Sequence, residues 1–340
     1  MELKFGILGS GSWSTALAKI LTDNGHTIQW WIRNPDTIIA IKKRKHNPHY
    51  LTTANFDVQQ LEMSSSIIEV IRDSDVLVVG IPSAYLMPAL FELPTDIFKG
   101  KKIISAIKGI LPNEEHQLLN EYLEQSFHVP ISDYFTVMGP CHAEEVAAEK
   151  LSYLTFSGVD AEATTLIASN FKTDYLNTVT NHDIWGTQYA AVLKNIYAVG
   201  AGMAHGLEYG DNFLSVYIAN AADEMVGFLR KINEVKLLSC DGDAKLNYAA
   251  SVYLGDLLVT CYSLYSRNRT FGNMIGKGYS VKVAQLEMNM VAEGYPASKG
   301  LYQINESVGA SMPIAGTVYK ILWEGLSAGE GFKEIEKGLK

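Results

Sequence analysis

The feature that most constrains the fold is a glycine-containing segment near the start of the chain, Gly9-Ser10-Gly11-Ser12-Trp13-Ser14. Residues 3–8, which precede it, have the apolar character of a buried strand. Residues 14–24, which follow it, have the apolar spacing of a helix that ends at Asn24-Gly25. A strand, a glycine turn and a helix in this order predict a backbone that approaches an anion closely, because the helix N-terminus offers unpaired amide donors.

The rest of the chain changes from strand patterns to helix patterns. Four further strand-like segments occur at residues 27–32, 76–81, 102–107 and 135–138. Apolar strands separated by crossover-length segments are typical of a parallel sheet covered on both faces. Long helical patterns then occur at residues 184–207, 212–231, 247–265, 297–308 and 313–325. We therefore predict an α/β fold with two domains, an N-terminal Rossmann-like doubly wound sheet (residues 1–185) and a C-terminal all-α domain (residues 186–340).

Composition excludes several classes of protein. The 340 residues carry a formal net charge of −9, which argues against a nucleic-acid partner. The chain has neither a signal-peptide pattern nor an unbroken apolar stretch of about 20 residues, so we expect a cytoplasmic protein with no stable membrane insertion. The three cysteines, Cys141, Cys240 and Cys261, are far apart and predict neither a disulfide framework nor a structural metal site.

The glycine segment fits a dinucleotide site. Gly9 permits the tight turn, Gly11 lets the backbone approach a pyrophosphate, and Ser12 and Trp13 open the helix beyond. Ser14 stands at the position of the usual third glycine, and it is small enough for close packing of the helix against the strand. We therefore expect these residues to bind NAD or NADP.

Arg33 bears on the choice between the two cofactors. The second strand-like segment is followed by Arg33-Asn34 rather than by the carboxylate that binds the adenosine ribose in NAD-preferring folds. An arginine at this point neutralises the 2′-phosphate of NADP. The alternative is that Arg33 is a solvated loop residue, and NAD stays open.

Seven short motifs, taken in order, resemble those of the bacterial-type NAD(P)-dependent glycerol-3-phosphate dehydrogenases. They are Gly9 to Trp13, Lys108-Gly109, Gly139-Pro140, Lys194-Asn195, Gly255-Asp256-Leu257, Ser266-Arg267-Asn268 and Glu293-Gly294-Tyr295. The resemblance covers nearly the whole chain, and its most specific parts are residues 194–203 and 266–272. It implies reduction of dihydroxyacetone phosphate to sn-glycerol 3-phosphate, which supplies glycerophospholipid synthesis. We also expect a homodimer.

The resemblance assigns the proton transfer to Lys194. This lysine lies in an otherwise apolar helix pattern, where it either snorkels to a surface or is held in a cleft. The resemblance favours the cleft and implies that Lys194 is the general acid and base. Asp256 and Thr260 are four residues apart and share one helix face, so Asp256 is expected to orient Lys194 with support from Thr260 and Asn195. Taken alone, Asp256 also suits a helix cap.

Basic residues supply the local positive charge that a phosphorylated triose requires. Lys108 follows a strand at the carboxyl edge of the sheet, where the resemblance places it against substrate and nicotinamide; alternatively it is a turn lysine. Ser266, Arg267 and Asn268 combine a hydroxyl, a guanidinium and an amide, which together suit a phosphate dianion. Arg269 is expected to be a solvated neighbour. The alternative is a charged helix end without a ligand.

The remaining assignments rest on the resemblance alone. It places Gly139 and Cys141 at the substrate, and it places Ala143, Val291, Glu293 and Arg267 at the cofactor. Cys141 stands where the family commonly has serine or threonine, and its thiol is a weaker hydrogen-bond donor. A nucleophilic Cys141-His142 pair is disfavoured, because neighbours on an extended chain point apart.

Two other functions remain open. Another β-hydroxyacid-type dehydrogenase of the same build would share the glycine motif and the helical lysine, but not the phosphate residues. A non-catalytic NAD(P)H-binding regulator would not need Lys194, Asp256 and Arg267 together. Residues 234–245 form a longer segment than the resemblance leads us to expect, and no function is assigned to them.

Overall fold

The computed structural model describes residues 3–235, 247–288 and 291–340. The chain divides into two compact units: Met1–Ile107 with Gln117–Ile184, and Lys108–His116 with Trp185–Lys340. The segment Lys108–His116 thus belongs to the second unit, whereas the sequence placed it in the N-terminal domain. Its contacts explain this, because the Asn195 side chain donates a hydrogen bond to the Lys108 carbonyl (3.0 Å) and Ile110 packs against Gly300.

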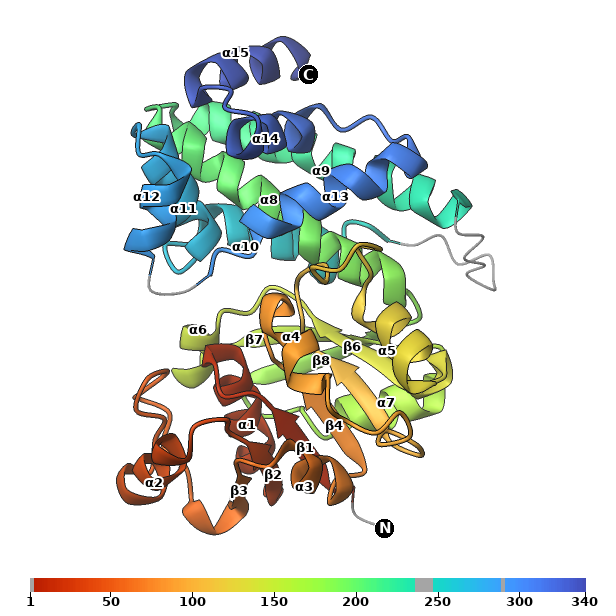
Figure 1. Ribbon diagram of the computed structural model, residues 1–340. Helices are drawn as coiled ribbons and strands as arrows, with labels where there is room; N and C mark the ends of the chain where they lie inside the picture. The colour runs from red at the N-terminus through yellow and green to blue at the C-terminus, as the bar shows by residue number, and fades with distance from the viewer. Residues whose placement is uncertain (1–2, 236–246, 289–290) are drawn as a thin grey trace. The chain divides into compact units, whose positions relative to one another are not determined.

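The first unit is built on one eight-stranded sheet, whose strands lie in the order β3-β2-β1-β4-β5-β6-β7-β8 (Figure 1). The strands are β1 (Phe5–Leu8), β2 (Ile28–Trp31), β3 (Leu61–Ser64), β4 (Val76–Val79), β5 (Lys102–Ser105), β6 (Tyr134–Met138), β7 (Ser152–Ser157) and β8 (Leu176–Asn181). Neighbouring strands are parallel except β6 and β7. The predicted Rossmann-like sheet is confirmed.

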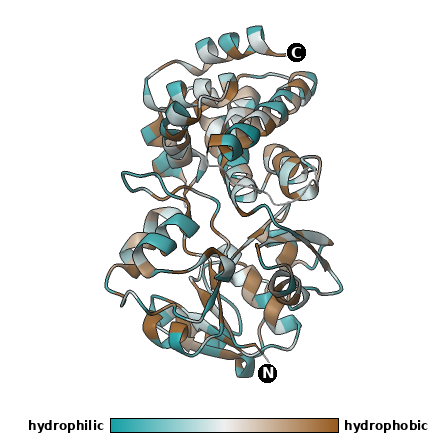
Figure 2. Cartoon of the chain, turned by 90° about the vertical axis from the view of Figure 1, so that its right-hand side faces the viewer, coloured by the Kyte–Doolittle hydropathy of each residue, from teal (hydrophilic) through white to brown (hydrophobic). Residues whose placement is uncertain are grey.

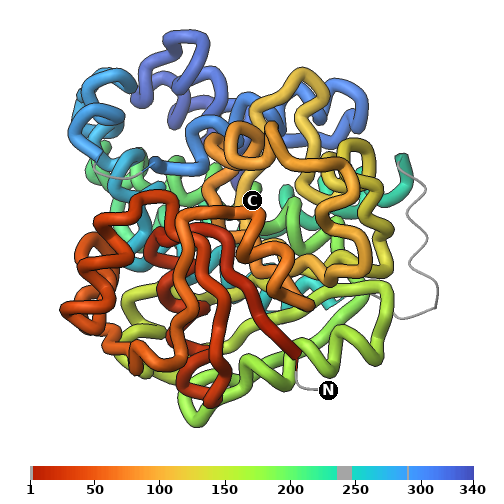
Figure 3. Tube along the Cα trace, turned by 60° about the horizontal axis from the view of Figure 1, so that its bottom comes forward, coloured from red at the N-terminus to blue at the C-terminus, as the bar shows by residue number. Residues whose placement is uncertain are grey.

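The helices of this unit connect the strands in two directions. They are α1 (Ser12–Asp23), α2 (Pro35–Arg44), α3 (Ile67–Arg72), α4 (Ser83–Leu90), α5 (Leu119–Phe127), α6 (Ala143–Ala147) and α7 (Ala161–Ser169). The crossover through α1 runs from β1 to β2, and the one through α3 returns from β3 to β4. Because such crossovers are right-handed, α1 and α3 cover opposite faces, and the order reverses between β1 and β4. Figure 3 shows the red and orange strands of this region running side by side.

Three strands were not predicted, namely β3, β7 and β8. β3 and β8 are the two edge strands, and most of their residues are half-buried or exposed. Their sequences therefore lack the continuous apolar character of β1 and β4, which are buried along their whole length. The strand patterns thus missed both edge strands, and they also missed β7, which is buried at all but one position and pairs antiparallel with β6.

All regular secondary structure in the described residues of the second unit is helical. Its elements are α8 (Ile184–Gly206), α9 (Asp211–Val235), the π-helical segment η3 (Ser251–Gly255), α10 (Asp256–Tyr262), α11 (Arg267–Gly276), α12 (Val281–Glu287), α13 (Gly294–Val308), α14 (Pro313–Trp323) and α15 (Ala328–Gly338). The all-α prediction is confirmed. The predicted helix 247–265 is shorter and begins with a π-helical turn, and nearly all of segment 234–245 lies outside the described residues. In Figure 2 most of α15 is teal or white, and its buried Phe332 and Ile335 lie one turn apart.

Two helices of this unit contact each other through glycines. An added Cβ on Gly272 of α11 would lie 1.9 Å from the carbonyl oxygen of Val199 in α8, and one on Gly202 of α8 would lie 2.0 Å from the Arg269 carbonyl oxygen. The two backbones are therefore closer than any larger residue permits. This contact fixes the position of α11 relative to α8.

Candidate active site

The glycine turn is shaped for an anion. Gly9 has a φ of +118°, and an added Cβ would lie 3.2 Å from the Gly80 backbone. Gly11 is the N-cap of α1, and a Cβ there would meet nothing within 4 Å, so the space beside this helix N-terminus is open. The Ser14 hydroxyl donates to the Gly80 carbonyl (3.1 Å). The close packing predicted for Ser14 is thus confirmed, and the turn fits a dinucleotide.

The other cofactor candidates of the first unit are dispersed along it. Ser12 is buried and Trp13 is half-buried in the first turn of α1, and Ala143 is the first residue of α6. Arg33 is exposed, just before the Asn34 cap of α2. Their contacts with a cofactor, including the role of Arg33 in recognising NADP, stay predictions.

Gly139 and Cys141 both lie against the Tyr153 carbonyl of β7. Gly139 has a φ of +139°, and an added Cβ would lie 2.7 Å from that oxygen. The buried Cys141 thiol donates to the same oxygen (3.1 Å). The structure therefore gives the thiol a structural partner, and the predicted contact with substrate stays a prediction.

Lys194 lies in the middle of α8, and its side chain is buried. The residue is only 4% exposed, and its ammonium forms an ion pair with the Asp256 Oδ1 atom. Asp256, which is 1% exposed, is the first residue of α10 and caps no helix with its side chain. The alternatives of a snorkelling lysine and a capping aspartate are both wrong. A buried lysine and carboxylate stabilise each other's charges.

Thr260 supports the aspartate from the same helix face. Its hydroxyl donates to the Asp256 carbonyl (2.5 Å) and lies 3.5 Å from Asp256 Oδ1. The second carboxylate oxygen, Oδ2, is buried and has no hydrogen-bond partner among the described residues. Buried carboxylate oxygens are normally hydrogen-bonded. Oδ2 is thus left with unused acceptor capacity.

Two asparagines form a relay that joins three helices and a loop. Asn195 Nδ2 donates to the Lys108 carbonyl (3.0 Å), Asn268 Nδ2 donates to Asn195 Oδ1 (2.9 Å), and the Gly294 amide donates to Asn268 Oδ1 (2.9 Å). The end groups fix both amide orientations, because a carbonyl only accepts and a backbone N–H only donates. The relay uses one of the two hydrogens of the Asn268 amide group.

The predicted phosphate residues lie at the start of α11, but they do not act alike. Ser266 is buried and is the N-cap of the helix, with its Oγ accepting from the Arg269 amide (3.3 Å), and its contact with a phosphate stays a prediction. Arg267 is the first helical residue and is exposed. A guanidinium beside the positive end of a helix favours a dianion.

The expectation that Arg269 is solvated is wrong. It is partly buried rather than solvated, and its Nε atom is buried without a hydrogen-bond partner among the described residues. Its charge acts on the buried Cys261 thiol, as does that of Lys194, although burial dominates and raises the pKa of that thiol to about 12. Arg269 therefore lies in the same polar interior as Lys194.

Val291 and Glu293 precede α13. Val291 is exposed, and Glu293 is the N-cap residue before Gly294, whose amide ends the asparagine relay. The half-buried Lys108 lies at the other end of that relay. The structure thus brings together Lys194, Asn195, Asp256, Thr260, Asn268 and the Lys108 backbone within the second unit.

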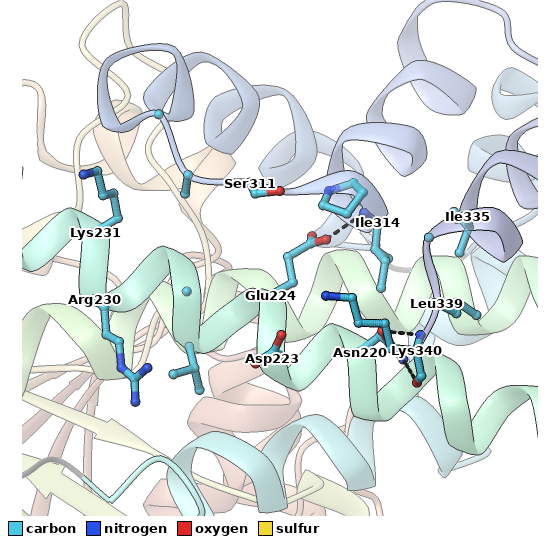
Figure 4. A pocket seen from close by; sticks show the side chains of 16 residues that line it. Asn220, Asp223, Glu224, Arg230, Lys231, Ser311, Ile314, Ile335, Leu339 and Lys340 are labelled. Atoms are coloured by element: carbon cyan, nitrogen blue, oxygen red, sulfur yellow. Dashed lines mark hydrogen bonds between the residues drawn. The ribbon is translucent and has the colours of Figure 1, made fainter.

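A separate cavity of about 520 Å³ in the second unit contains none of the predicted site residues (Figure 4). Its wall includes Glu224 of α9, which is 7% exposed. The carboxylate accepts hydrogen bonds from the Ile314 amide (2.7 Å), the Ala315 amide (2.9 Å) and the Tyr197 hydroxyl (3.1 Å). It therefore joins α8, α9 and the start of α14. No periodicity in the sequence singled out this residue.

Glu224 is expected to make stability depend on pH. Burial raises the pKa of its carboxyl from the ordinary 4.5 to about 7. Because the folded state holds this proton more tightly, the stabilisation is complete below pH 4.5 and is lost as the pH rises to about 7, by on the order of 3 kcal/mol. The measurement is the unfolding free energy of wild type and Glu224→Gln across this range. If the unfolding free energies of the two proteins changed with pH in the same way, Glu224 would not be the source of the pH dependence.

The described residues contain no group of three His, Cys, Asp or Glu side chains placed to hold a metal ion. In residues 3–235, 247–288 and 291–340, no helix is both long and apolar enough to cross a membrane.

The fold and the two sites together define a two-domain NAD(P)-dependent dehydrogenase. The family model of the NAD-dependent glycerol-3-phosphate dehydrogenase N-terminus matches residues 4–164, and that of the C-terminus matches residues 183–333. The chain belongs to the NAD-dependent glycerol-3-phosphate dehydrogenase family. It is an oxidoreductase that uses NAD or NADP.

Curated relatives agree with this assignment, and a solved structure shares the fold. The chain is 32% identical to a glycerol-3-phosphate dehydrogenase [NAD(P)+] of Streptococcus suis strain 05ZYH33, over 98% of this chain and 95% of the relative. It is 34% identical to that of Streptococcus equi subsp. zooepidemicus strain H70, over 95% and 92%. The crystal structure of glycerol-3-phosphate dehydrogenase from Coxiella burnetii has the same fold, with a TM-score of 0.87 at 24% identity over 98% of each chain.

Proposed function

We propose that this protein reduces dihydroxyacetone phosphate to sn-glycerol 3-phosphate with NAD(P)H, reversibly, and so supplies glycerophospholipid synthesis. The observation that carries the proposal is the buried Lys194–Asp256 pair with its unpartnered Oδ2 atom. It provides a proton donor beside an acceptor for a substrate hydroxyl. Reduction of a ketone uses a proton donor at the carbonyl oxygen, and the free carboxylate oxygen suits the neighbouring hydroxyl of a hydroxyketone.

The bound nicotinamide supplies the hydride to C2 of the substrate. Lys194 donates a proton to the C2 oxygen as negative charge develops there, and takes that proton back in the oxidative direction. Asp256 Oδ1 holds the ammonium in place, and Oδ2 accepts a hydrogen bond from the C1 hydroxyl. The balance is one ketone, one NAD(P)H and one proton giving one alcohol and one NAD(P)+.

Positively charged side chains and helix N-termini bind the phosphate of the substrate and the phosphates of the cofactor. Arg267 and the start of α11 bind the substrate phosphate, with one amide hydrogen of Asn268. Lys108 contributes charge near the developing alkoxide. The glycine turn binds the pyrophosphate, and Arg33 binds the 2′-phosphate of NADP. The cofactor is also contacted by Ala143, Val291, Glu293 and Arg267.

The test is loss of nicotinamide absorbance with the purified protein and dihydroxyacetone phosphate, using NADPH and NADH in turn. Turnover supports the proposal. Turnover only with 3-oxo or 2-oxo acids would identify another dehydrogenase of the same build. Cofactor binding without turnover on any of these substrates would favour a regulator.

Arg267→Ala is expected to raise KM for dihydroxyacetone phosphate about 10- to 100-fold with a small change in kcat, because a charge-assisted contact to the phosphate is lost. Arg267→Lys should recover part of this loss, since it restores the charge but not the paired donors. The comparison substrate is unphosphorylated dihydroxyacetone. If Arg267→Ala impairs both substrates equally, Arg267 does not bind the phosphate.

A further inference from the structure

Three successive carbonyl oxygens of the glycine turn each accept a hydrogen bond from a side chain. Trp30 Nε1 donates to the Gly9 carbonyl (2.7 Å). Asn47 Nδ2 donates to the Ser10 carbonyl (3.0 Å). Thr15 Oγ1 donates to the Gly11 carbonyl (2.9 Å), which also accepts a hydrogen bond from the Thr15 amide (2.9 Å) at the start of α1. The donors come from β2, from the chain after α2 and from α1, so distant segments converge on one turn.

All three donor residues are fully buried. Hydrogen bonds shielded from water are stronger than exposed ones, and an unpaired carbonyl in their place would be costly. The Asn47 amide group also donates to Thr15 Oγ1 (2.9 Å). Its Oδ1 accepts from the amides of His49 (3.0 Å) and Tyr50 (3.3 Å). These partners fix the orientation of the Asn47 side chain.

The direction of a carbonyl determines the direction of the next amide. In a trans peptide the C=O and the following N–H point to opposite sides. Because the carbonyls of Gly9, Ser10 and Gly11 point to buried donors, the amides of Ser10, Gly11 and Ser12 point the other way. A row of backbone N–H groups is an anion site, whereas a carbonyl turned into it would repel a phosphate.

We propose that Trp30, Asn47 and Thr15 are positioning residues for the dinucleotide diphosphate. They hold the carbonyl oxygens of the turn inward, so that the turn presents N–H donors to the anion. The inference rests on the binding of NAD(P), which family membership establishes, and it does not depend on the identity of the second substrate.

The variant Asn47→Asp removes the hydrogen bond from the Asn47 side chain to the Ser10 carbonyl. Aspartate keeps the oxygens that accept from His49 and Tyr50, but it has no donor for the Ser10 carbonyl and adds negative charge beside it. We expect the Kd for NADH, measured by nicotinamide fluorescence, to rise at least about 10-fold. Melting temperature and circular dichroism establish that the variant is folded.

Variants of Trp30 and Thr15 remove the other two donors, and a variant of Trp31 is the matched control. Trp30→Phe removes the indole N–H but keeps the ring against Phe56, and Thr15→Val removes the hydroxyl, which Thr15→Ser restores. The control is Trp31→Phe, because Trp31 Nε1 also donates to a backbone carbonyl, that of Ser65 (3.1 Å), but outside the turn. Trp30→Phe and Thr15→Val should weaken NADH binding, while Trp31→Phe and Thr15→Ser should not.

The decisive comparison is between ADP-ribose, which carries the diphosphate, and adenosine, which does not. Positioning of the turn predicts weaker binding of ADP-ribose with unchanged binding of adenosine. The proposal is overturned if folded variants bind NADH as the wild type does, if both ligands weaken equally, or if Trp31→Phe weakens binding as much as Trp30→Phe. A wild type that binds NADH but does not reduce dihydroxyacetone phosphate would reject the proposed function alone.

Discussion

Lys194→Met is expected to lower kcat about 10²- to 10⁴-fold and to destabilise the protein by about 3–5 kcal/mol. The loss of rate follows from the loss of the proton donor. The loss of stability follows because methionine keeps the apolar stem but leaves Asp256, which is 1% exposed, as a buried carboxylate without its cation. Steady-state kinetics and urea unfolding measure the two effects on one protein sample.

The double variant Lys194→Met/Asp256→Asn separates these effects. Asparagine is close to aspartate in shape and carries no charge, so the double variant should regain most of the lost unfolding free energy and none of the lost rate. If Lys194→Met alone retains wild-type stability, the two charges are not a buried pair. If it retains wild-type kcat, Lys194 is not the acid.

Gly272→Ala is expected to destabilise the protein by about 3 kcal/mol or more, because the new methyl group would lie 1.9 Å from the Val199 carbonyl oxygen. Both sides of this contact are backbone, so α8 and α11 must separate. Since α11 carries Arg267 and Asn268, KM for dihydroxyacetone phosphate should rise as well. Denaturant unfolding and substrate titration test the two parts.

The matched control is Gly227→Ala in the interior of α9. An added Cβ there meets nothing within 4 Å, so alanine should stabilise the helix by about 1 kcal/mol. A loss of unfolding free energy for Gly272→Ala and a gain for Gly227→Ala would locate the close contact between α8 and α11. Equal effects would mean that Gly272 is not limited by the neighbouring backbone.

The sequence by itself determined the centre of each unit. β1 and β4 are continuous apolar segments because both faces of a central parallel strand are buried, and that property is visible in a single segment. The roles of Gly9 and Gly11 can likewise be predicted from one short segment, because a turn that contacts an anion restricts the residue types locally. The assignment of Lys194 and Asp256 to one site required the family resemblance, because 62 positions separate them.

Only the tertiary structure decided which groups are partners. Periodicity indicates which face of an element is buried, but not which distant donor meets which acceptor. Asn47 reaches the glycine turn from 37 residues away, and Glu224 reaches Ala315 from 91 residues away. The same reason explains why the sequence did not indicate the capping role of Ser266 or the partial burial of Arg269. Their sequence suggested charge and hydroxyl donors for a ligand, whereas the packing of α11 uses one as a cap and partly buries the other.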